Sequence, residues 1–285
     1  AVDHRLSMVT DPALIQYAIP ACRRLWQERF EDSDAFCDWY FSERFVPALS
    51  AGVFLSSNGA EQLVSMAHGR LLPLSIAGKS CLSLMVGGVA TRKDAERRGY
   101  MRLAMQRIRE IAAASGAELL VLSPVDPAIY TGLGYIVCAE SLHVRTVGGS
   151  PLPTVPAPDA ESLLGCYTRC AMRYDFAPCR TPEAMRSRIR ELRSDGAELV
   201  VLTSAERMLG YAFFNRAENR AEEVFAEDTD AYLRLLRGMP AGLDAMLPPD
   251  LPLNGKRHAQ LMALSTGSDH SAEGSGRTAY CPEEF

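Results

Sequence analysis

Residues 88 to 103 read Gly88-Val89-Ala90-Thr91-Arg92-Lys93-Asp94-Ala95-Glu96-Arg97-Arg98-Gly99-Tyr100-Met101-Arg102-Leu103. The order is an apolar strand, a basic loop, a glycine and a helix with apolar residues at helical spacing. A helix N-terminus offers unpaired backbone N–H groups and a partial positive charge. Two arginines and a glycine placed just before it, Arg97, Arg98 and Gly99, make a cradle for an anion. An ordinary arginine-rich turn capped by glycine would show the same pattern.

A second stretch helps to decide between an anion cradle and an ordinary turn. It reads Ala128-Ile129-Tyr130-Thr131-Gly132-Leu133-Gly134-Tyr135 and follows a strand of purely apolar residues. With both stretches in this order, the chain resembles the GNAT superfamily of acetyl-CoA-dependent N-acetyltransferases. That family has a strand of Gly-Val-Ala-Val type, a loop of Arg/Gln-x-x-Gly-x-Gly/Ala form and a later Ala-x-x-Phe-Tyr-x-x-x-Gly-Phe element. The chain departs from the loop pattern at Glu96 and Met101.

The bulky residues after Gly99 are similar to the Eis-type (enhanced intracellular survival) branch of the superfamily. In that branch a second, degenerate GNAT-like domain follows the first, and a third, sterol-carrier-like domain follows the second. This chain is too short for the third domain.

The resemblance implies a cosubstrate and a mechanism. Acetyl-CoA would be the acyl donor, its pantetheine arm pairing with the backbone of Val89, Ala90 and Thr91. Its pyrophosphate would be held by the loop formed by Arg97, Arg98, Gly99, Tyr100, Met101 and Arg102. Tyr130 matches the family tyrosine that gives a proton to the CoA sulfur, and a phenol with a pKa near 10 suits that role. In Eis-type enzymes the C-terminal carboxylate reaches the active site, which makes Phe285 the second expected catalytic residue. A core tyrosine and a solvated terminus are the alternatives.

The whole pattern predicts an α/β protein with a mixed, mostly antiparallel sheet flanked by helices, the GNAT fold, followed by a second, degenerate GNAT-like α/β domain. An uncharged segment rich in proline and glycine, 148–158, predicts a linker between an acetyl-CoA-binding domain at 1–147 and a degenerate domain with a C-terminal tail at 159–285. In the second half the join after the third strand, Ala226-Glu227-Asp228-Thr229, lacks an arginine pair and a glycine. We expect no pyrophosphate to bind there.

Helices are expected at 12–30, 33–44, 99–115, 127–132, 159–174, 181–194 and 229–237. Strands are expected at 6–9, 51–56, 62–75, 80–91, 118–123, 135–147, 198–203, 208–215 and 221–225.

The first two helices are rich in aromatic residues, from Trp26 to Phe45, and the resemblance places the acceptor site there. Three nearby carboxylates could attract a cationic amine: Asp32, Asp34 and Asp38. An aromatic core stripe with a solvated acidic edge explains the same residues and is the favoured interpretation. His68 and His143 lie in strand patterns and are expected to be structural. No general base is visible, since the stretch where many relatives carry a glutamate reads Val86-Gly87-Gly88.

Composition sets further limits. The net charge of −5 disfavours nucleic-acid binding. No signal sequence, lipid anchor or spanning helix is apparent, so we expect a cytoplasmic protein with no membrane partner. The eight cysteines form no CxxC pair, which favours buried thiols in a reducing compartment and predicts no metal site.

The resemblance to the GNAT superfamily implies an acetyl-CoA-dependent N-acetyltransferase that acts on a primary amine of a small molecule or peptide by direct attack on the thioester. The alternative is a non-catalytic CoA-binding sensor or scaffold with the same fold. Acyl-chain length and acceptor stay open, and a homo-oligomer is compatible with the sequence.

Overall fold

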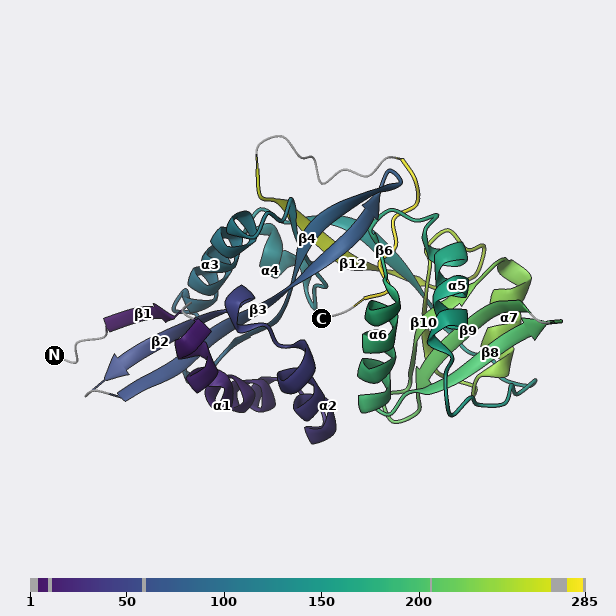
Figure 1. Ribbon diagram of the computed structural model, residues 1–285, viewed down its shortest axis with the longest axis horizontal. Helices are drawn as coiled ribbons and strands as arrows, with labels where there is room; N and C mark the ends of the chain where they lie inside the picture. Colours follow the sequence, from purple (N-terminus) through teal and green to yellow (C-terminus); the bar gives the residue numbers. More distant parts are fainter. Residues whose placement is uncertain (1–4, 10–11, 58–59, 206, 268–275, 284–285) are drawn as a thin grey trace.

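The strands of this chain form one long sheet. The computed structural model describes residues 5–9, 12–57, 60–205, 207–267 and 276–283. Within these ranges the sheet has the order β1-β2-β3-β4-β5-β12-β6-β11-β10-β9-β8, and β7 pairs with β3 off this path. The β4–β5 and β10–β11 pairs are parallel, and the other pairs are antiparallel. Helices flank the sheet (Figure 1), which confirms the predicted fold class.

The first half follows the expected order of elements closely. Its helices are α1 (Pro12–Arg29), α2 (Asp34–Trp39), α3 (Tyr100–Ala114) and α4 (Pro127–Thr131). Its strands are β1 (Arg5–Val9), β2 (Ala51–Ser57), β3 (Ala60–Ile76), β4 (Lys79–Thr91), β5 (Leu119–Leu122) and β6 (Ile136–Arg145).

The helix expected at 33–44 differs from the prediction. It begins as expected, because the Ser33 hydroxyl accepts a hydrogen bond from the N–H of Phe36 at 3.1 Å. The α-helix ends at Trp39, and the chain continues as a π-helical turn, Tyr40–Arg44. A hydrogen bond between residues five apart, the spacing of a π-helix, closes this turn. It runs from the Phe45 N–H to the Tyr40 carbonyl at 2.8 Å.

The second half also contains the expected elements. Its helices are α5 (Ala160–Ala171), α6 (Pro182–Ser194) and α7 (Thr229–Gly238). Its strands are β7 (Ala177–Pro178), β8 (Glu198–Ser204), β9 (Arg207–Asn215), β10 (Arg220–Ala226), β11 (Asp244–Leu247) and β12 (Lys256–Ser265). In the described part of the chain, no helix combines the length and apolarity needed to cross a membrane.

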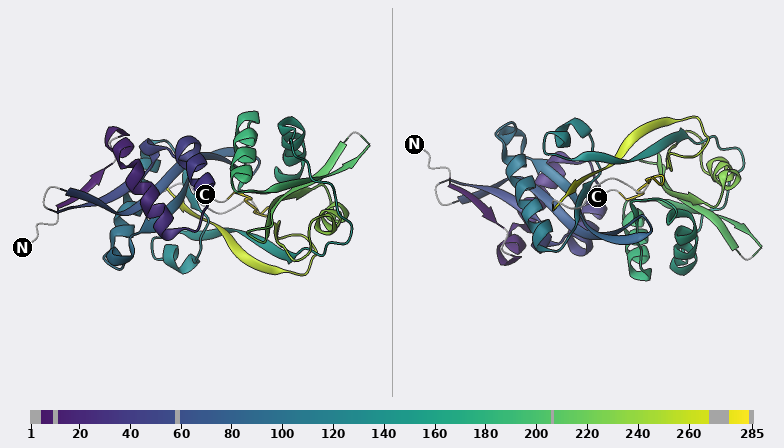
Figure 2. Two further views of the ribbon diagram at one scale, coloured as in Figure 1. Left: turned by 90° about the horizontal axis from the view of Figure 1, so that it is seen from below. Right: turned by 90° about the horizontal axis from the view of Figure 1, so that it is seen from above.

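Helices cover both faces of the strands in each half (Figure 2). In the first half, α3 packs on Val53 and Val64, whereas α1 and α2 pack on Phe54 and Met66. In the second half, α7 packs on one face of β8 and β9, and α5 and α6 pack on the other. Neighbouring residues of a strand point to opposite faces, so these strands are apolar throughout rather than alternating.

The last strand joins the two halves of the chain. β12 pairs with β5 through Met262–Ser265 and with β6 through Lys256–Ala263, so it lies between two strands of the first half. β6 in turn pairs with β11. The sheet is therefore continuous from β1 to β8. The division of the chain into domains at 148–158 stays a prediction.

The predicted linker lies against the second half. The N–H of Leu152 donates to the carbonyl of Gly238 at the end of α7, and the N–H of Val155 donates to the carbonyl of Leu199 on β8. This proline- and glycine-rich segment is therefore held to the second half by backbone hydrogen bonds.

The tail, residues 277–283, runs between the halves and ends in an ion-pair cluster. Glu283 is buried, and its carboxylate pairs with Arg70 on β3 and with Arg180, the latter at 3.0 Å. Arg180 also binds Glu223 of β10. These guanidinium groups oppose the effect of burial and hold the pKa of Glu283 well below its usual range.

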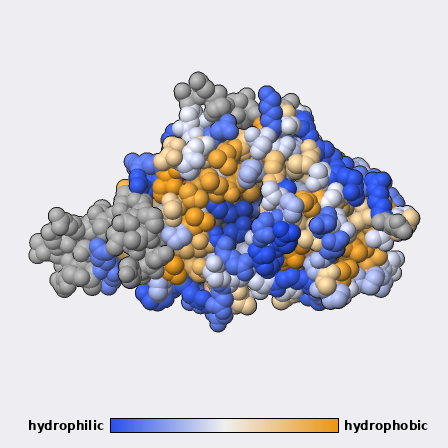
Figure 3. Space-filling view, viewed as in Figure 1, coloured by the Kyte–Doolittle hydropathy of each residue, from blue (hydrophilic) through white to orange (hydrophobic). Residues whose placement is uncertain are grey.

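Figure 3 shows hydrophilic residues gathered in the middle of the face that is viewed in Figure 1, over α6. There Arg190 of α6 pairs with Glu43 at 2.7 Å.

We predict that Glu283→Gln destabilises the fold by about 3 kcal/mol at pH 7, because it leaves buried arginines without their carboxylate. The pKa of Glu283 is lower in the folded than in the unfolded chain. The stabilisation of the fold by its ionised carboxylate is therefore fully present at pH values above the ordinary carboxyl pKa and is lost as the pH falls. The gap between wild type and variant in urea unfolding should therefore shrink from pH 6 to pH 3. Glu110→Gln, at an exposed pair with Arg107, is the control and should cost under about 1 kcal/mol. Equal losses in both variants would contradict the prediction.

Candidate functional site

Strands β4 and β5 run side by side for only four residues. Ser83–Val86 pair in parallel with Leu119–Leu122, where β5 ends. β4 continues to Thr91, held on its other edge by β3. No described strand pairs with the β5-facing edge of residues 87–91. Free backbone N–H and C=O groups on such an edge can bind an extended ligand as an added strand would.

The helix after β4 begins without a side-chain cap. Its N-cap is Gly99 at φ 83°, and Arg97 has φ 60°. A Cβ on residue 99 would meet nothing within 4 Å, so the left-handed backbone, rather than lack of space, favours glycine there. The first helical hydrogen bond runs from the Leu103 N–H to the Gly99 carbonyl at 3.3 Å. The N–H groups of residues 100–102 precede it and can face an anion.

The basic side chains of this loop are exposed: Arg97, Arg98 and Arg102. Among the described residues none of the three takes part in an ion pair, which leaves their charge available. The carboxylate of Glu96 is instead held by Arg29 of α1 at 2.8 Å. This departure from the family loop pattern is therefore neutralised by a neighbouring helix.

The second departure, Met101, is accommodated by packing. Met101 and Tyr100 are partly buried against the core between α3 and the sheet. A bulky residue after Gly99 thus adds to the core beneath α3.

The equivalent helix of the second half begins in a different way. In each half a strand, a helix and a parallel strand follow one another: β4-α3-β5 and β10-α7-β11. The N-cap of α7 is Asp228, whose carboxylate accepts a hydrogen bond from the Ala231 N–H at 2.9 Å. A carboxylate already occupies the position that an anionic ligand would take. This contrast supports the expectation that only the first half binds a phosphate group.

Tyr130 lies on α4, a short helix capped by Asp126, which accepts from the Ala128 N–H at 2.9 Å. The Tyr130 ring is half-buried and meets the Tyr135 ring edge-on, with centroids 6.0 Å apart. Burial raises the pKa of the Tyr130 phenol, so the hydroxyl keeps its proton at neutral pH. No described residue hydrogen-bonds this hydroxyl, which is thus able to donate to a ligand.

The structure places some of the predicted site residues on one core cluster and Ala90 on another. Val89 of β4, Met101 of α3 and Tyr130 of α4 all pack on one core cluster. Phe285 lies outside the described residues. No group of three His, Cys, Asp or Glu side chains in the described chain is placed to hold a metal ion.

The aromatic residues of α1 and α2 form a closed cluster. Trp26 is 3 % exposed and lies over His68, with ring centroids 5.8 Å apart. The Tyr40 hydroxyl and His68 Nδ1 are 2.8 Å apart, and burial lowers the pKa of His68 to about 3, so the ring is neutral. A Cβ on Gly88 would lie 2.6 Å from Trp26 Cζ3. A glycine in β4 is therefore what allows the indole to approach the strand.

The cavity beside these rings has a volume of only about 10 Å³ and is lined by Cys22, Phe45 and His68 among others. The aromatic residues are packed as a core, in agreement with the interpretation favoured from the sequence.

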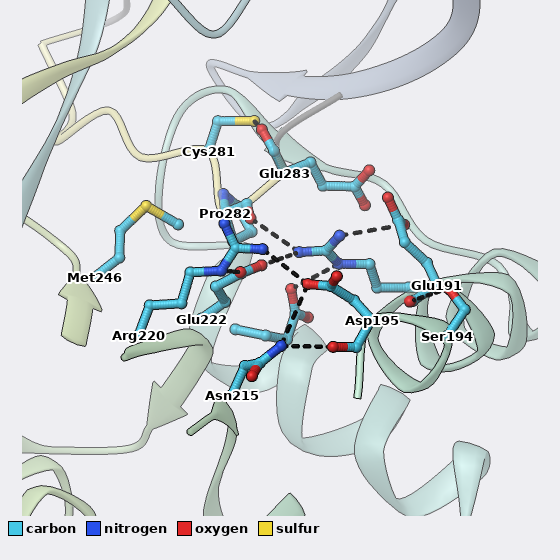
Figure 4. Close-up of polar contacts among 12 residues, drawn as sticks. Glu191, Ser194, Asp195, Asn215, Arg220, Glu222, Met246, Cys281, Pro282 and Glu283 are labelled. Atoms are coloured by element: carbon cyan, nitrogen blue, oxygen red, sulfur yellow. Dashed lines mark hydrogen bonds and ion pairs between the residues drawn. The ribbon is translucent and has the colours of Figure 1, made fainter. Parts of the chain in front are cut away.

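An acidic pocket lies beyond Trp26, between the halves of the chain. The Trp26 Nε1–H donates to Asp32 at 2.7 Å, and Asp32 lines a pocket of about 110 Å³. Its charged lining consists of Asp32, Glu191, Asp195 and Glu222, set against Arg188 and Arg220. Figure 4 shows several of these groups beside Pro282 and Glu283. Sequence reasoning found Asp32 but not the carboxylates that α6 and β10 bring to it.

Comparisons with known proteins agree with this geometry. Residues 15–138 match the family model described as Acetyltransferase (GNAT) domain. The sequence shows no significant match to a curated protein.

Three solved structures illustrate the shared fold. The first, a conserved protein from Enterococcus faecalis V583 described as a probable N-acyltransferase, is 15% identical, with a TM-score of 0.68 over 93% of this chain and 73% of the other. Eis1 from Mycobacterium abscessus is 16% identical, with a TM-score of 0.61 over 92% and 73%. An acetyltransferase from Pyrococcus horikoshii, described as putative, is 12% identical, with a TM-score of 0.56 over 96% and 94%.

The family match covers the strand–loop–helix segment and the stretch up to Cys138, where the sequence carried the resemblance. For residues 15–138 it confirms the resemblance to GNAT acetyltransferases and, with it, the predicted class of acyltransferases. The likeness to Eis1 shows a common fold across most of the chain.

Proposed function

Because residues 15–138 are a GNAT acetyltransferase domain, we propose that this chain transfers an acetyl group from acetyl-CoA to a primary amine of a small molecule or peptide. The observation that carries the proposal is the open β4 edge leading into the uncapped N-terminus of α3. Measuring thiol release from acetyl-CoA against a panel of amines tests it.

The open β4 edge and the uncapped N-terminus of α3 suit two different parts of acetyl-CoA. The backbone of residues 87–91 has a free edge for the amide groups of the pantetheine arm, with Val89, Ala90 and Thr91 as the expected contacts. The loop from Arg97 to Arg102 supplies backbone N–H groups and three guanidinium groups for the pyrophosphate. An extended chain entering along β4 would therefore meet positive charge where the strand ends.

The chemistry needs one bond to form and one to break. The amine nitrogen attacks the thioester carbonyl, the C–N bond forms, the C–S bond breaks and the nitrogen loses a proton. The departing thiolate takes a proton from Tyr130, whose hydroxyl stays protonated because burial raises its pKa. Most of the acceleration would come from holding amine and thioester together, with water removing the amine proton.

The acidic pocket supports a cationic acceptor. Four carboxylates and two guanidinium groups line it, and Arg44 also pairs with Glu191, which leaves one carboxylate more than the guanidinium groups around them. Trp26 links this pocket to Gly88 on β4, because the indole touches both Asp32 and the strand. An amine drawn to the pocket would be held one indole ring away from the open strand edge.

One observation favours the alternative function, a CoA-binding sensor without catalysis. The cavity at the aromatic cluster is too small for an acceptor, so an open acceptor site is not preformed there. CoA binding in calorimetry without thiol release from any amine would favour the sensor.

We predict that Arg98→Ala weakens acetyl-CoA binding by about 1–3 kcal/mol, the scale of a charge-assisted hydrogen bond. Isothermal titration measures this directly. Glu96→Gln is the matched control from the same loop. Because Arg29 already holds Glu96, this variant should bind acetyl-CoA equally well or more tightly. Unchanged affinity in Arg98→Ala would remove Arg98 from the site.

Tyr130→Phe keeps the ring and deletes the proton donor. We expect kcat to fall about 100-fold or more, with CoA affinity nearly unchanged. Tyr135→Phe, at the ring that Tyr130 meets edge-on, is the control for packing and should keep kcat within a few-fold. A Tyr130→Phe variant that loses affinity and turnover equally would show a binding or packing role.

The proposal also gives Phe285 a role, in which its carboxylate orients the amine or relays its proton. Glu283, two residues earlier, is fixed on β3 through Arg70. Deleting residues 284–285 while keeping Glu283 should lower turnover tenfold or more without loss of thermal stability. Full activity of this deletion would exclude the role.

A further inference from the structure

Three polar side chains away from the proposed transfer site form a hydrogen-bonded row. Ser141 Oγ lies 3.0 Å from His143 Nε2, and His143 Nδ1 lies 3.0 Å from Asp244 Oδ2. With the Asp244 carboxylate accepting from Nδ1–H, Nε2 is left to accept the proton of the Ser141 hydroxyl. The atoms follow the order of a nucleophile, its base and the group that orients the base.

The strand geometry explains why these residues meet. Ser141 and His143 are two apart on β6, so they point to the same face. β11 pairs with β6 in a register that sets Met246 opposite His143, and Asp244 is two residues before Met246 on β11. Sequence reasoning judged His143 structural from its strand pattern, and Asp244 lies 101 residues away in the chain.

The row borders a pocket of about 220 Å³ at the end of β5. Its lining includes Ser123, Val125, Ser141, His143, His258 and Gln260. Ser141 is 1 % exposed and forms part of the wall, while the His143 side chain is 26 % exposed. A substrate carbonyl would have to enter the pocket to reach the hydroxyl. Tyr130 and the arginine loop are not among the lining residues, although Pro127, at the start of the helix α4 that carries Tyr130, is one of them.

A hydrogen-bond donor also borders this pocket. The β12–β6 register shifts between Ala259 and Leu261, which marks a bulge at Gln260. The Gln260 Nε2 amide donates to the sulfur of Met246 at 3.2 Å, and a thioether is a weak acceptor. This donor can exchange that partner for an oxyanion at little cost.

We propose that Ser141, His143 and Asp244 form a second reactive centre, a serine nucleophile for small esters or thioesters. The Oγ–C bond forms as the ester or thioester bond breaks. The hydroxyl proton moves to His143 Nε2 and then to the departing alkoxide or thiolate. Water then attacks the acyl-serine with His143 as base, which releases a carboxylic acid and restores the hydroxyl. The proposal does not depend on the acetyltransferase function.

The test is labelling of the folded, full-length chain by a fluorophosphonate probe, followed by peptide mass spectrometry. Attack by Oγ forms an O–P bond as fluoride leaves and His143 takes the proton. We expect one adduct, on Ser141, that is absent in urea-denatured protein. Hydrolysis of p-nitrophenyl acetate should show the same dependence on folding. No adduct in the folded protein, or an adduct at another residue, would overturn the proposal.

Variants assign the roles within the row. Ser141→Ala should abolish labelling, His143→Gln should slow it at least 100-fold, and Asp244→Asn should slow it at least tenfold, with circular dichroism confirming that each variant folds. Ser123→Ala removes the rival serine of the same pocket and should label as the wild type does. Labelling that survives Ser141→Ala, or that is equally fast in His143→Gln, would show that the row is only structural.

Discussion

The pairing of β12 with both β5 and β6 is the constraint on which the rest of the structure depends. This strand comes from the end of the chain, yet it holds β5 from the side opposite β4. β5 can therefore stop after four residues and still be secured, while β4 continues with only β3 as its partner. The open edge of β4 exists because the sheet is anchored on the far side of β5. The same strand brings His258 and Gln260 to the Ser141 pocket.

The two halves contain the same arrangement of elements, but only one of them leaves its helix N-terminus open. In both, a strand leads through a short join into a helix and then into a parallel strand. What separates them is the first helical turn. A left-handed Gly99 leaves the N–H groups of α3 open, whereas Asp228 caps α7 with its own carboxylate. A single side chain at the N-cap decides whether a helix end can receive an anion. The second half instead contributes Glu191, Arg190 and Glu283 to ion pairs with the first half.

Buried charge connects the halves more specifically than apolar packing could. The carboxylate of Glu283 needs guanidinium groups from both halves, Arg70 and Arg180, to remain ionised in the interior. Such a group tolerates only the arrangement that supplies its partners, since an unpaired buried charge is costly. The tail is thereby fixed beside β3 at Arg70, which lies two residues from His68 on the same face of the strand. The acidic pocket next to Asp32 is built from the same kind of paired groups.

The sequence by itself determined the elements and their order, because helix caps, glycines and apolar periodicity act over a few residues. Ser33 and Gly99 mark helix starts that the structure contains. It also determined the family, through two motifs whose residues are local. The tertiary structure alone decided which distant residues meet. The Glu96–Arg29 pair, the carboxylates around Asp32 and the contact of His143 with Asp244 all join separate elements. Their register depends on the pairing of strands far apart in the chain, which no local pattern encodes.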